Sequence, residues 1–248
     1  MMTEVCAPLL YHDFMATRAE DSSSSSRNVG SQTLARGLRV LEIVATSEQG
    51  VTTQEIADHL GVHRTIAYRI LATLSDFRLV LRSADGRYRG GAGLAVLGQG
   101  IHSTLRGVAE SHLRELAREV QSTVALIVEE DDEAVALAVV EPPNAAYHLS
   151  FHVGSRHPLD RGAAGVALLS ARRPRSRDSA AVREARERGY AKTFGEVEPG
   201  AYGVAATLAP VEGAPAACVN LITYRADVAE RAVPAVLEAV RRIDDALS

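Results

Sequence analysis

Apolar residues recur every three or four positions in the first third of the chain, which is the spacing of amphipathic helices. One apolar stripe predicts a first helix over 32–46 and consists of Leu34, Leu38, Leu41 and Val44. A second helix is predicted over 53–60, since Thr52 and Glu55 have the spacing of a capping box and Gly61 suits a left-handed stop. A third helix is predicted over 64–77, with inward-facing residues at Ile66, Ile70, Leu71 and Leu74.

A hairpin is predicted directly after the third helix. Two short extended runs, 79–82 and 87–89, flank Asp85-Gly86, a dipeptide typical of tight hairpin turns. Two short helices joined by a glycine-containing turn form a helix-turn-helix, and the hairpin that follows them would be its wing. We therefore expect a winged helix-turn-helix domain over 31–92. The residues before it, 1–30, end in a five-serine tract and are expected to be a disordered tail.

The rest of the chain alternates helices with strands. The glycine-rich stretch 90–100 predicts a hinge that leads into a linker helix over 93–106. Residues 107–248 predict an α+β domain. Its helices are expected over 108–121, 162–170, 179–188 and 227–247, and its strands over 123–129, 134–141, 147–153, 202–210 and 216–224.

Charge is distributed unevenly along the chain. The whole sequence has a net charge of −4, yet residues 31–100 contain 8 Arg and 6 acidic residues, whereas residues 107–248 have a net charge of −5. The basic segment is the one with the helix-turn-helix pattern, and all of its basic residues are Arg, which suits bidentate contact with phosphate or guanine. Aromatic residues make up only 4% of the chain, which argues against a surface that stacks on single-stranded bases.

Several other classes of protein lack their signature in this sequence. No apolar run is long enough for a membrane span, and the first residues do not have the pattern of a secretory signal, so we expect a cytoplasmic protein without membrane contact. Cys6 and Cys218 are far apart, and no Cys/His cluster is present. We expect no metal or other cofactor. His148 and His152 would share a face of one predicted strand, but packed or exposed histidines are the simpler interpretation.

The start of the third helix has the chemistry of a DNA-reading surface. In a helix-turn-helix, the N-terminal residues of the second helix contact base edges in the major groove. The candidates on this helix are His63, Arg64, Thr65, Tyr68 and Arg69, and those on the wing are Arg82 and Arg87. An ordinary amphipathic helix and hairpin with solvated charged faces would give the same residues, and the capping box, glycine turn, wing and local charge together favour DNA.

Two separate segments resemble the IclR-type family of bacterial regulators. The first comprises LARGLRVLEIV from Leu34 and EIADHLGVHRTIAYRILATL from Glu55. The second, HPLDRGAAGVALL from His157, is similar to the family signature at the start of its effector-domain helix, and later landmarks extend the resemblance over 31–248. Two departures concern the effector: residues 171–179 are shorter and more basic than usual, and Val166 stands where the family often has Lys.

The resemblance implies a winged helix-turn-helix, a linker helix and a GAF-like effector domain with a mixed sheet. It also implies homodimers, often paired into tetramers, which bind palindromic operators on double-stranded DNA as repressors or activators. Members of the family respond to small organic acids, aromatic acids or related metabolites. On this basis the chain is expected to be a DNA-binding transcription regulator with a small-molecule effector.

Candidate effector-binding residues come from three predicted elements. The small residues Gly162, Ala163 and Ala164 would expose backbone N–H groups at a helix start, where an anion is favoured, and Arg161 can add a bidentate grip. The resemblance places Glu198, with Glu196, in a loop that covers the pocket. The remaining candidates share one face of a late strand and are Cys218 and Asn220. The small residues would equally suit close packing of the helix on a sheet.

Two other classes of function remain open. An enzyme could assemble His148, His152, His157, Glu196 and Cys218 into an acid–base or nucleophile site, but the sequence has no nucleophile elbow, phosphate loop or HExxH motif, so we expect no catalysis. A DNA-binding architectural protein that senses nothing would have the same helix-turn-helix. A ligand-induced rise in melting temperature separates a sensor from such a scaffold.

Overall fold

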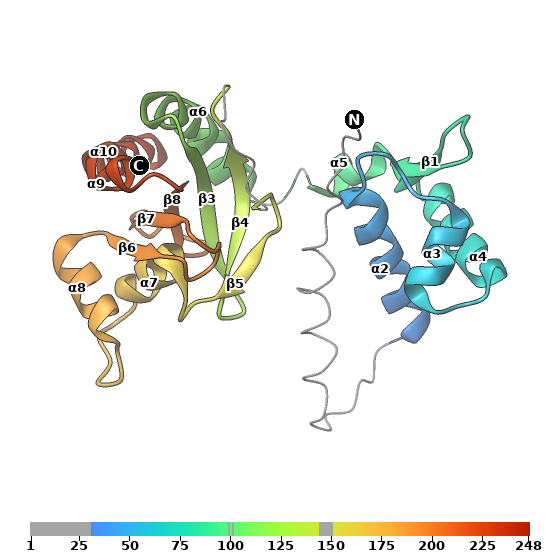
Figure 1. Cartoon of the computed structure of the whole chain (residues 1–248), viewed down its shortest axis with the longest axis horizontal. Helices are drawn as coiled ribbons and strands as arrows, with labels where there is room; N and C mark the ends of the chain where they lie inside the picture. The colour runs from blue at the N-terminus through green and yellow to red at the C-terminus, as the bar shows by residue number, and fades with distance from the viewer. Residues whose placement is uncertain (1–30, 99, 101, 144–150) are drawn as a thin grey trace, which may run out of the picture. The chain divides into compact units, whose positions relative to one another are not determined.

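The computed structural model of the chain describes residues 31–98, 100, 102–143 and 151–248 (Figure 1). The chain divides into two compact units, with unit 1 ending at Gln99 and unit 2 running from Gly100 to Ser248. The tail predicted over 1–30 lies outside the described residues. Each unit has its own hydrophobic core and is described separately.

Unit 1 is a winged helix-turn-helix, as predicted. Its elements are α2 (Gln32–Thr46), α3 (Thr53–Leu60), α4 (Arg64–Asp76), β1 (Val80–Arg82), β2 (Tyr88–Gly90) and α5 (Gly93–Gly98). The capping box is present in full, because the side chain of Thr52 accepts from the Glu55 amide and the Glu55 carboxylate accepts from the Thr52 amide. Gly61 ends α3 in the left-handed region at φ 61°. The local chemistry of the sequence therefore fixes this turn.

The wing is an antiparallel pair of strands around the predicted Asp-Gly turn. β1 pairs with β2 from Val80↔Gly90 to Arg82↔Tyr88, and Gly86 has a φ of 81°. An isolated antiparallel bridge joins Val51 to Tyr88 and ties the base of the wing to the segment that precedes α3. The wing is thus held to the helices by backbone hydrogen bonds as well as by packing.

Two details of the predicted helices in unit 1 are wrong. On α2 the side chains of Leu34 and Leu38 are 62% and 53% exposed, whereas the predicted Val44 is buried and is joined in the core by Val40. Ile66 on α4 is 39% exposed, while Ile70 and Leu71 are buried with Ala67. Helical spacing identifies a stripe, but only packing decides which neighbouring residues lie at its buried centre.

The linker helix predicted over 93–106 is not one helix. α5 ends at Gly98, and α6 (Ser103–Val120) begins within the predicted linker, so 103–106 belong to the first helix of unit 2. Glycine costs about 1 kcal/mol relative to alanine inside a helix; Gly98 is the last residue of α5, and Gly100 lies between the two helices. His102, the N-cap of α6, is left-handed at φ 42°, which ends any continuous helix.

Unit 2 is built on one six-stranded sheet. Its strands are β3 (Thr123–Glu130), β4 (Glu133–Val140), β5 (Arg156–Pro158), β6 (Ala191–Phe194), β7 (Tyr202–Thr207) and β8 (Ala217–Thr223), in the order β5-β4-β3-β8-β7-β6. Every pairing within the described residues is antiparallel, so the expectation of a mixed sheet is wrong. Hairpin connections join β3 to β4 and β6 to β7 without a crossover, and they allow antiparallel neighbours.

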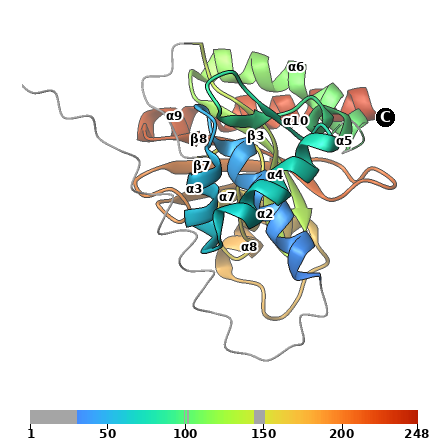
Figure 2. The ribbon, with the colours of Figure 1, turned by 90° about the vertical axis from the view of Figure 1, so that its right-hand side faces the viewer.

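Helices cover both faces of this sheet, which confirms the predicted α+β class (Figure 1). α6 and α10 (Val233–Leu247) pack side by side on one face, as the rotated view in Figure 2 also shows, with α9 (Ala226–Arg231) next to them. α7 (Gly162–Ala171) and α8 (Ala180–Arg188) cover the opposite face. The central strand β3 is therefore buried on both sides, with Val124 and Leu126 in one core and Ala125 and Ile127 in the other.

Three predictions in unit 2 are corrected. The strand predicted over 147–153 is not seen at 151–153, which is irregular, and its first part lies outside the described residues; the strand in this region is β5. β6 was not predicted. The closing helix is two helices, because Pro234 lacks the N–H that a continuous helix needs, and α10 restarts there. None of the described helices combines the length and apolar character of a membrane span.

Candidate DNA-binding surface and ligand pocket

The first turn of α4 is organised by the side chain of His63. His63 is the N-cap, and its Nδ1 accepts a hydrogen bond from the Thr65 amide at 3.3 Å and lies 3.0 Å from Thr65 Oγ1. An N-cap of this kind satisfies one of the free N–H groups at a helix start. His63 and Thr65 are both exposed, so they combine an outward position with a role in shaping the turn.

The outward face of α4 carries two unpaired cations. Arg64, Tyr68 and Arg69 are exposed, with Tyr68 at 55%. The guanidinium groups of Arg64 and Arg69 make no hydrogen bond or salt bridge to any residue that the structure describes. Ala67, Ile70 and Leu71 fix the opposite face in the core. A rigid helix thus presents solvated cations at its N-terminal half, which is the arrangement that a major groove accepts.

The arginines of the wing differ in their contacts. Arg82 is exposed, and its guanidinium lies 5.9 Å from the ring centroid of Tyr88. Arg87 is instead bonded within unit 1, because its Nη1 donates to the Gly50 carbonyl at 2.8 Å and pairs with Glu55 at 3.2 Å. Arg87 therefore anchors the wing in the structure, whereas the sequence pattern predicts that it contacts DNA.

Glu55 is the common partner of the wing and of the capping box. The backbone N–H of Thr52 holds the pKa of Glu55 below its usual value, and Arg87 lowers it further. Glu55 Oε2 accepts from the Thr52 amide at 2.6 Å. One carboxylate thereby links the start of α3 to the wing.

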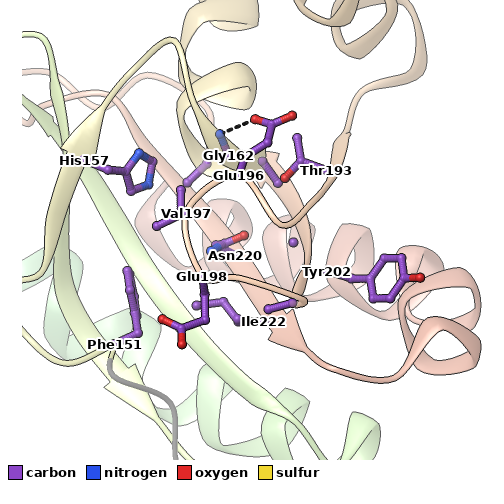
Figure 3. Close-up of a pocket in the computed structure, with 14 residues that line it drawn as sticks. Phe151, His157, Gly162, Thr193, Glu196, Val197, Glu198, Tyr202, Asn220 and Ile222 are labelled. Carbon is purple, nitrogen blue, oxygen red and sulfur yellow. Dashed lines mark hydrogen bonds between the residues drawn. The ribbon is translucent and has the colours of Figure 1, made fainter. Parts of the chain in front are cut away.

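A pocket opens on the α7 side of the sheet in unit 2 (Figure 3). The start of α7, the loop between β6 and β7, and the strands β7 and β8 surround it. Its empty space is about 410 Å³ when the open mouth is counted. The lining consists of Phe151, His157, Gly162, Ala163, Ala164, Thr193, Glu196, Val197, Glu198, Ala201, Tyr202, Gly203, Asn220 and Ile222. The mixture of apolar and polar walls suits a small organic ligand.

The start of α7 is held by a carboxylate from the facing loop. The Gly162 amide donates to Glu196 Oε2 at 2.7 Å, as the dashed line in Figure 3 marks. Gly162 has a φ of 71°, and a Cβ built on it would lie 2.6 Å from Val197 Cγ2. Only glycine fits at this position, because both the backbone conformation and the cover of the loop exclude a side chain.

Two further polar side chains face the pocket. Asn220 is 6% exposed, and its Oδ1 has no hydrogen-bond partner in the described part of the chain. His157 is 8% exposed, and burial lowers its pKa, so the ring is neutral near pH 7. Its Nδ1 lies 3.0 Å from the Pro158 carbonyl and therefore bears the proton, which leaves Nε2 as an acceptor.

Five of the seven predicted effector residues line the pocket: Gly162, Ala163, Ala164, Glu198 and Asn220. The other two do not. Arg161 is exposed and makes no capping bond, and Cys218 is fully buried, with its thiol directed at the Ala164 carbonyl 3.9 Å away. Burial raises the pKa of Cys218, which disfavours the reactive thiolate.

Sequence reasoning missed several lining residues, and the reason differs among them. His157 lies in the segment that carries the resemblance, but nothing local marks it as a pocket residue. Glu196 is expected in the covering loop, but its contact with the start of α7 is not. Thr193 lies on β6, the strand that was not predicted. Of the two histidines considered for a metal, His148 lies outside the described residues. Within the described ranges, no group of three or more His, Cys, Asp or Glu residues is placed to hold a metal ion.

Two family models match the chain. The IclR helix-turn-helix domain matches residues 33–84, and the bacterial transcriptional regulator IclR C-terminal domain matches residues 101–182. Together they cover more than half of the sequence. The first match contains α3, α4 and the start of the wing, and the second extends through α7.

Curated relatives agree with these matches. The HTH-type transcriptional regulator Rv1719 of Mycobacterium tuberculosis is 35% identical over 152 residues, which are 60% of this chain and 58% of that protein. The transcriptional repressor IclR of Escherichia coli is 28% identical over 144 residues, 56% of this chain and 52% of the repressor. The chain thus spans less than three fifths of the length of these relatives.

Solved structures show the same fold. An IclR homologue of Microbacterium hydrocarbonoxydans, complexed with 4-hydroxybenzoate, superposes with a TM-score of 0.72 at 24% identity and covers 87% of this chain and 99% of its own. A regulator from Alicyclobacillus acidocaldarius gives a TM-score of 0.68 at 24% identity, with coverage of 88% and 100%. At this identity the likeness extends to the fold alone.

Proposed function

Because the chain belongs to the IclR family, we propose that it is a DNA-binding transcription regulator whose unit 2 senses a small organic molecule. The observation that carries the DNA-binding part is the pair of exposed guanidinium groups of Arg64 and Arg69 on the outward face of α4, which have no partner among the described residues. His63, Thr65 and Tyr68 complete the proposed reading face, and Arg82 extends it to the wing. Arg87 is left out because its guanidinium is engaged within unit 1.

Replacement of one arginine tests this surface directly. Arg69→Ala is expected to weaken operator binding by about 1–3 kcal/mol, or roughly 5- to 150-fold, if the side chain reads a base. Arg39→Ala is the matched control, since Arg39 is an exposed arginine of unit 1 outside α4. Gel shifts in which both variants bind like the parent would place the reading face elsewhere.

We also propose that the chain acts as a homodimer, or as a dimer of dimers, on a palindromic operator. Four large apolar side chains of unit 1 support this proposal, because they are 53–66% exposed: Leu34, Leu38, Val96 and Leu97. Sedimentation of Leu38→Asp with Leu97→Asp is expected to give a lighter particle than the parent. An unchanged mass would exclude these side chains from the interface.

The pocket of unit 2 is the proposed effector site, and its ligand is proposed to be a carboxylate or aromatic acid. The helix start at Gly162, the apolar walls and the buried Asn220 support a small acid. The 4-hydroxybenzoate complex of the Microbacterium homologue makes that compound a reasonable first probe. Binding is expected to change operator affinity, since a ligand shifts only an equilibrium whose states it binds differently.

Ligand binding also separates the proposed sensor from its two rivals. Titration of organic acids while the melting temperature is followed should reveal a stabilising compound, whereas a scaffold without a sensor would show none. The same compound should be recovered unchanged, because we propose no catalysis at this site. Conversion of the compound would identify an enzyme. A regulator of bacterial genes would act in the cytoplasm, where the DNA lies.

A further inference from the structure

The anion position at the start of α7 is occupied by the chain itself. Gly162 is the first residue of this ten-residue helix, and its N–H donates to Glu196 Oε2 at 2.7 Å. Arg161, the N-cap, makes no side-chain hydrogen bond to the helix, so Glu196, 34 residues away in the sequence, caps it instead. Free N–H groups and the helix dipole favour a negative charge at this point.

Glu196 belongs to a surface loop that is closed at its base, where the Gly195 amide donates to the Ala201 carbonyl at 2.8 Å and the Ala201 amide donates to the Glu198 carbonyl at 3.1 Å. The described residues offer its carboxylate no second donor or cation, and both Glu196 and Val197 are exposed. Gly195 and Gly200 flank the loop with left-handed φ angles of 68° and 77°. Glu198 fastens its far side by accepting from the Tyr224 hydroxyl at 3.0 Å. The contact between Glu196 and Gly162 is therefore one that a competing ligand can replace.

The charge of the pocket makes such a replacement necessary for an acid. Glu196 and Glu198 are the acidic side chains among the lining residues, which include neither Lys nor Arg, and burial lowers the pKa of His157. A free carboxylate that entered beside both glutamates would meet two like charges. When Glu196 swings out, one charge leaves and the Gly162 amide becomes available at the same time.

A second, independent feature shows that the pocket is built for a ligand. Asn220 is more than nine-tenths buried, lines the pocket, and leaves its Oδ1 without a partner in the part of the chain described. A buried amide oxygen without a hydrogen bond is costly unless something donates to it. In Figure 3 Asn220 lies beneath the loop that bears Glu196 and Val197, so a ligand held at the helix start would be close to it.

We propose that Glu196 is an internal competitor of the effector: the ligand's carboxylate takes its place on the Gly162 amide, and the loop 195–200 moves away as it does so. This inference rests on the proposed effector site. It makes Glu196 a residue that sets how much acid is needed, because the ligand binds only the fraction of molecules in which Glu196 is displaced. It also couples occupation of the pocket to the position of the loop 195–200 that covers it.

Chemical rescue with acetate tests the proposal. Glu196→Ala vacates the helix start, so acetate should stabilise unit 2 of this variant and raise its melting temperature by about 4 °C at a concentration ten times the dissociation constant. The parent should need at least about tenfold more acetate for the same effect, because its own carboxylate competes. Sodium chloride at equal ionic strength corrects for screening.

Two controls separate displacement from general charge effects. Glu198→Ala removes the same charge and side chain from the same loop but does not touch Gly162, and acetamide has the shape of acetate without its charge. Rescue of Glu196→Ala by acetate alone supports the proposal. Equal stabilisation of both variants, equal effects of acetamide, or no effect of acetate would overturn it. If Glu196→Ala does not fold, Glu196→Gln replaces it, since the amide keeps the shape and weakens only the charge-assisted bond.

The result is independent of DNA binding. The titration contains no operator, so a chain that failed to bind DNA would still show rescue, and the proposed regulator function would fail by itself. Conversely, suppose that operator binding responds to an acid while acetate stabilises the Glu196 and Glu198 variants equally. That result would support the regulator function and refute the role of Glu196 as a competitor.

Discussion

Arg87→Ala should loosen the wing of unit 1. In the parent, the guanidinium donates to the partly buried Gly50 carbonyl at 2.8 Å and pairs with Glu55 at 3.2 Å. A hydrogen bond to a charged group contributes roughly 1.5–3 kcal/mol, and the low end of that range applies here because the Arg87 side chain is 35% exposed. The ion pair adds less than about 0.5 kcal/mol, because its side chains are 35% and 45% exposed and solvent screens them. The expected loss is about 1.5 kcal/mol.

Hydrogen exchange measures this loss where it arises. The amides of Val51 and Tyr88 bond to each other's carbonyls at 2.9 and 2.7 Å, and they hold the base of the wing next to Gly50. Their protection should fall about tenfold in Arg87→Ala, the equivalent of about 1.4 kcal/mol. Arg82→Ala is the control, because Arg82 is exposed and lies over the Tyr88 ring without a hydrogen bond or salt bridge to the described residues, and protection should change less than about twofold.

The same two variants separate anchoring from DNA contact. If Arg82 touches phosphate, its loss should reduce the salt dependence of operator binding by about one counterion. Arg87→Ala should keep the parent's salt dependence. Unchanged protection in Arg87→Ala, together with a reduced salt slope, would refute the anchoring argument and return Arg87 to the DNA surface.

Three further predictions follow from local geometry. Gly165→Ala should destabilise unit 2 by about 2–3 kcal/mol in urea titration, because its Cβ would lie 2.4 Å from a backbone oxygen, whereas Gly107→Ala, with open space around it, should stabilise by about 1 kcal/mol. Cys218 should resist thiol reagents until unfolding, as mapped by mass spectrometry, since burial raises its pKa. The Thr52 amide lowers the pKa of Glu55 in the folded state. The ionised Glu55 should therefore stabilise the fold fully above about pH 4.5, and this stabilisation should be lost as pH falls through the lower folded pKa. In a plot of melting temperature against pH, Glu55→Gln should show a smaller drop at acid pH than the parent.

The elements of unit 1 could be predicted because their signals are local. Thr52 and Glu55 are three residues apart, Gly61 follows directly, and Asp85-Gly86 determines its own turn. Each signal fixes backbone geometry whatever the rest of the chain does. The helix-turn-helix and its wing therefore follow from the sequence almost residue by residue.

The long-range contacts of the wing and the pocket are not local, and the sequence did not indicate them. Arg87 reaches Gly50 across 37 residues, and Glu196 reaches Gly162 across 34. Until the fold brings these partners together, each is an ordinary charged side chain in a loop or hairpin. Cys218 illustrates the reverse: strand alternation correctly put it on the face shared with Asn220, but only packing shows that α7 covers it while Asn220 lines the pocket.

The central claim is that the exposed face of α4 binds duplex DNA, and selection from a pool of random duplexes tests it most directly. At physiological salt, the parent chain should enrich a palindromic sequence and bind it about a thousandfold or more tighter than unrelated DNA. The variant with Arg64→Ala and Arg69→Ala should enrich nothing. If the parent retains no duplex, or if the doubly substituted chain selects the same sequence with equal affinity, the account is contradicted.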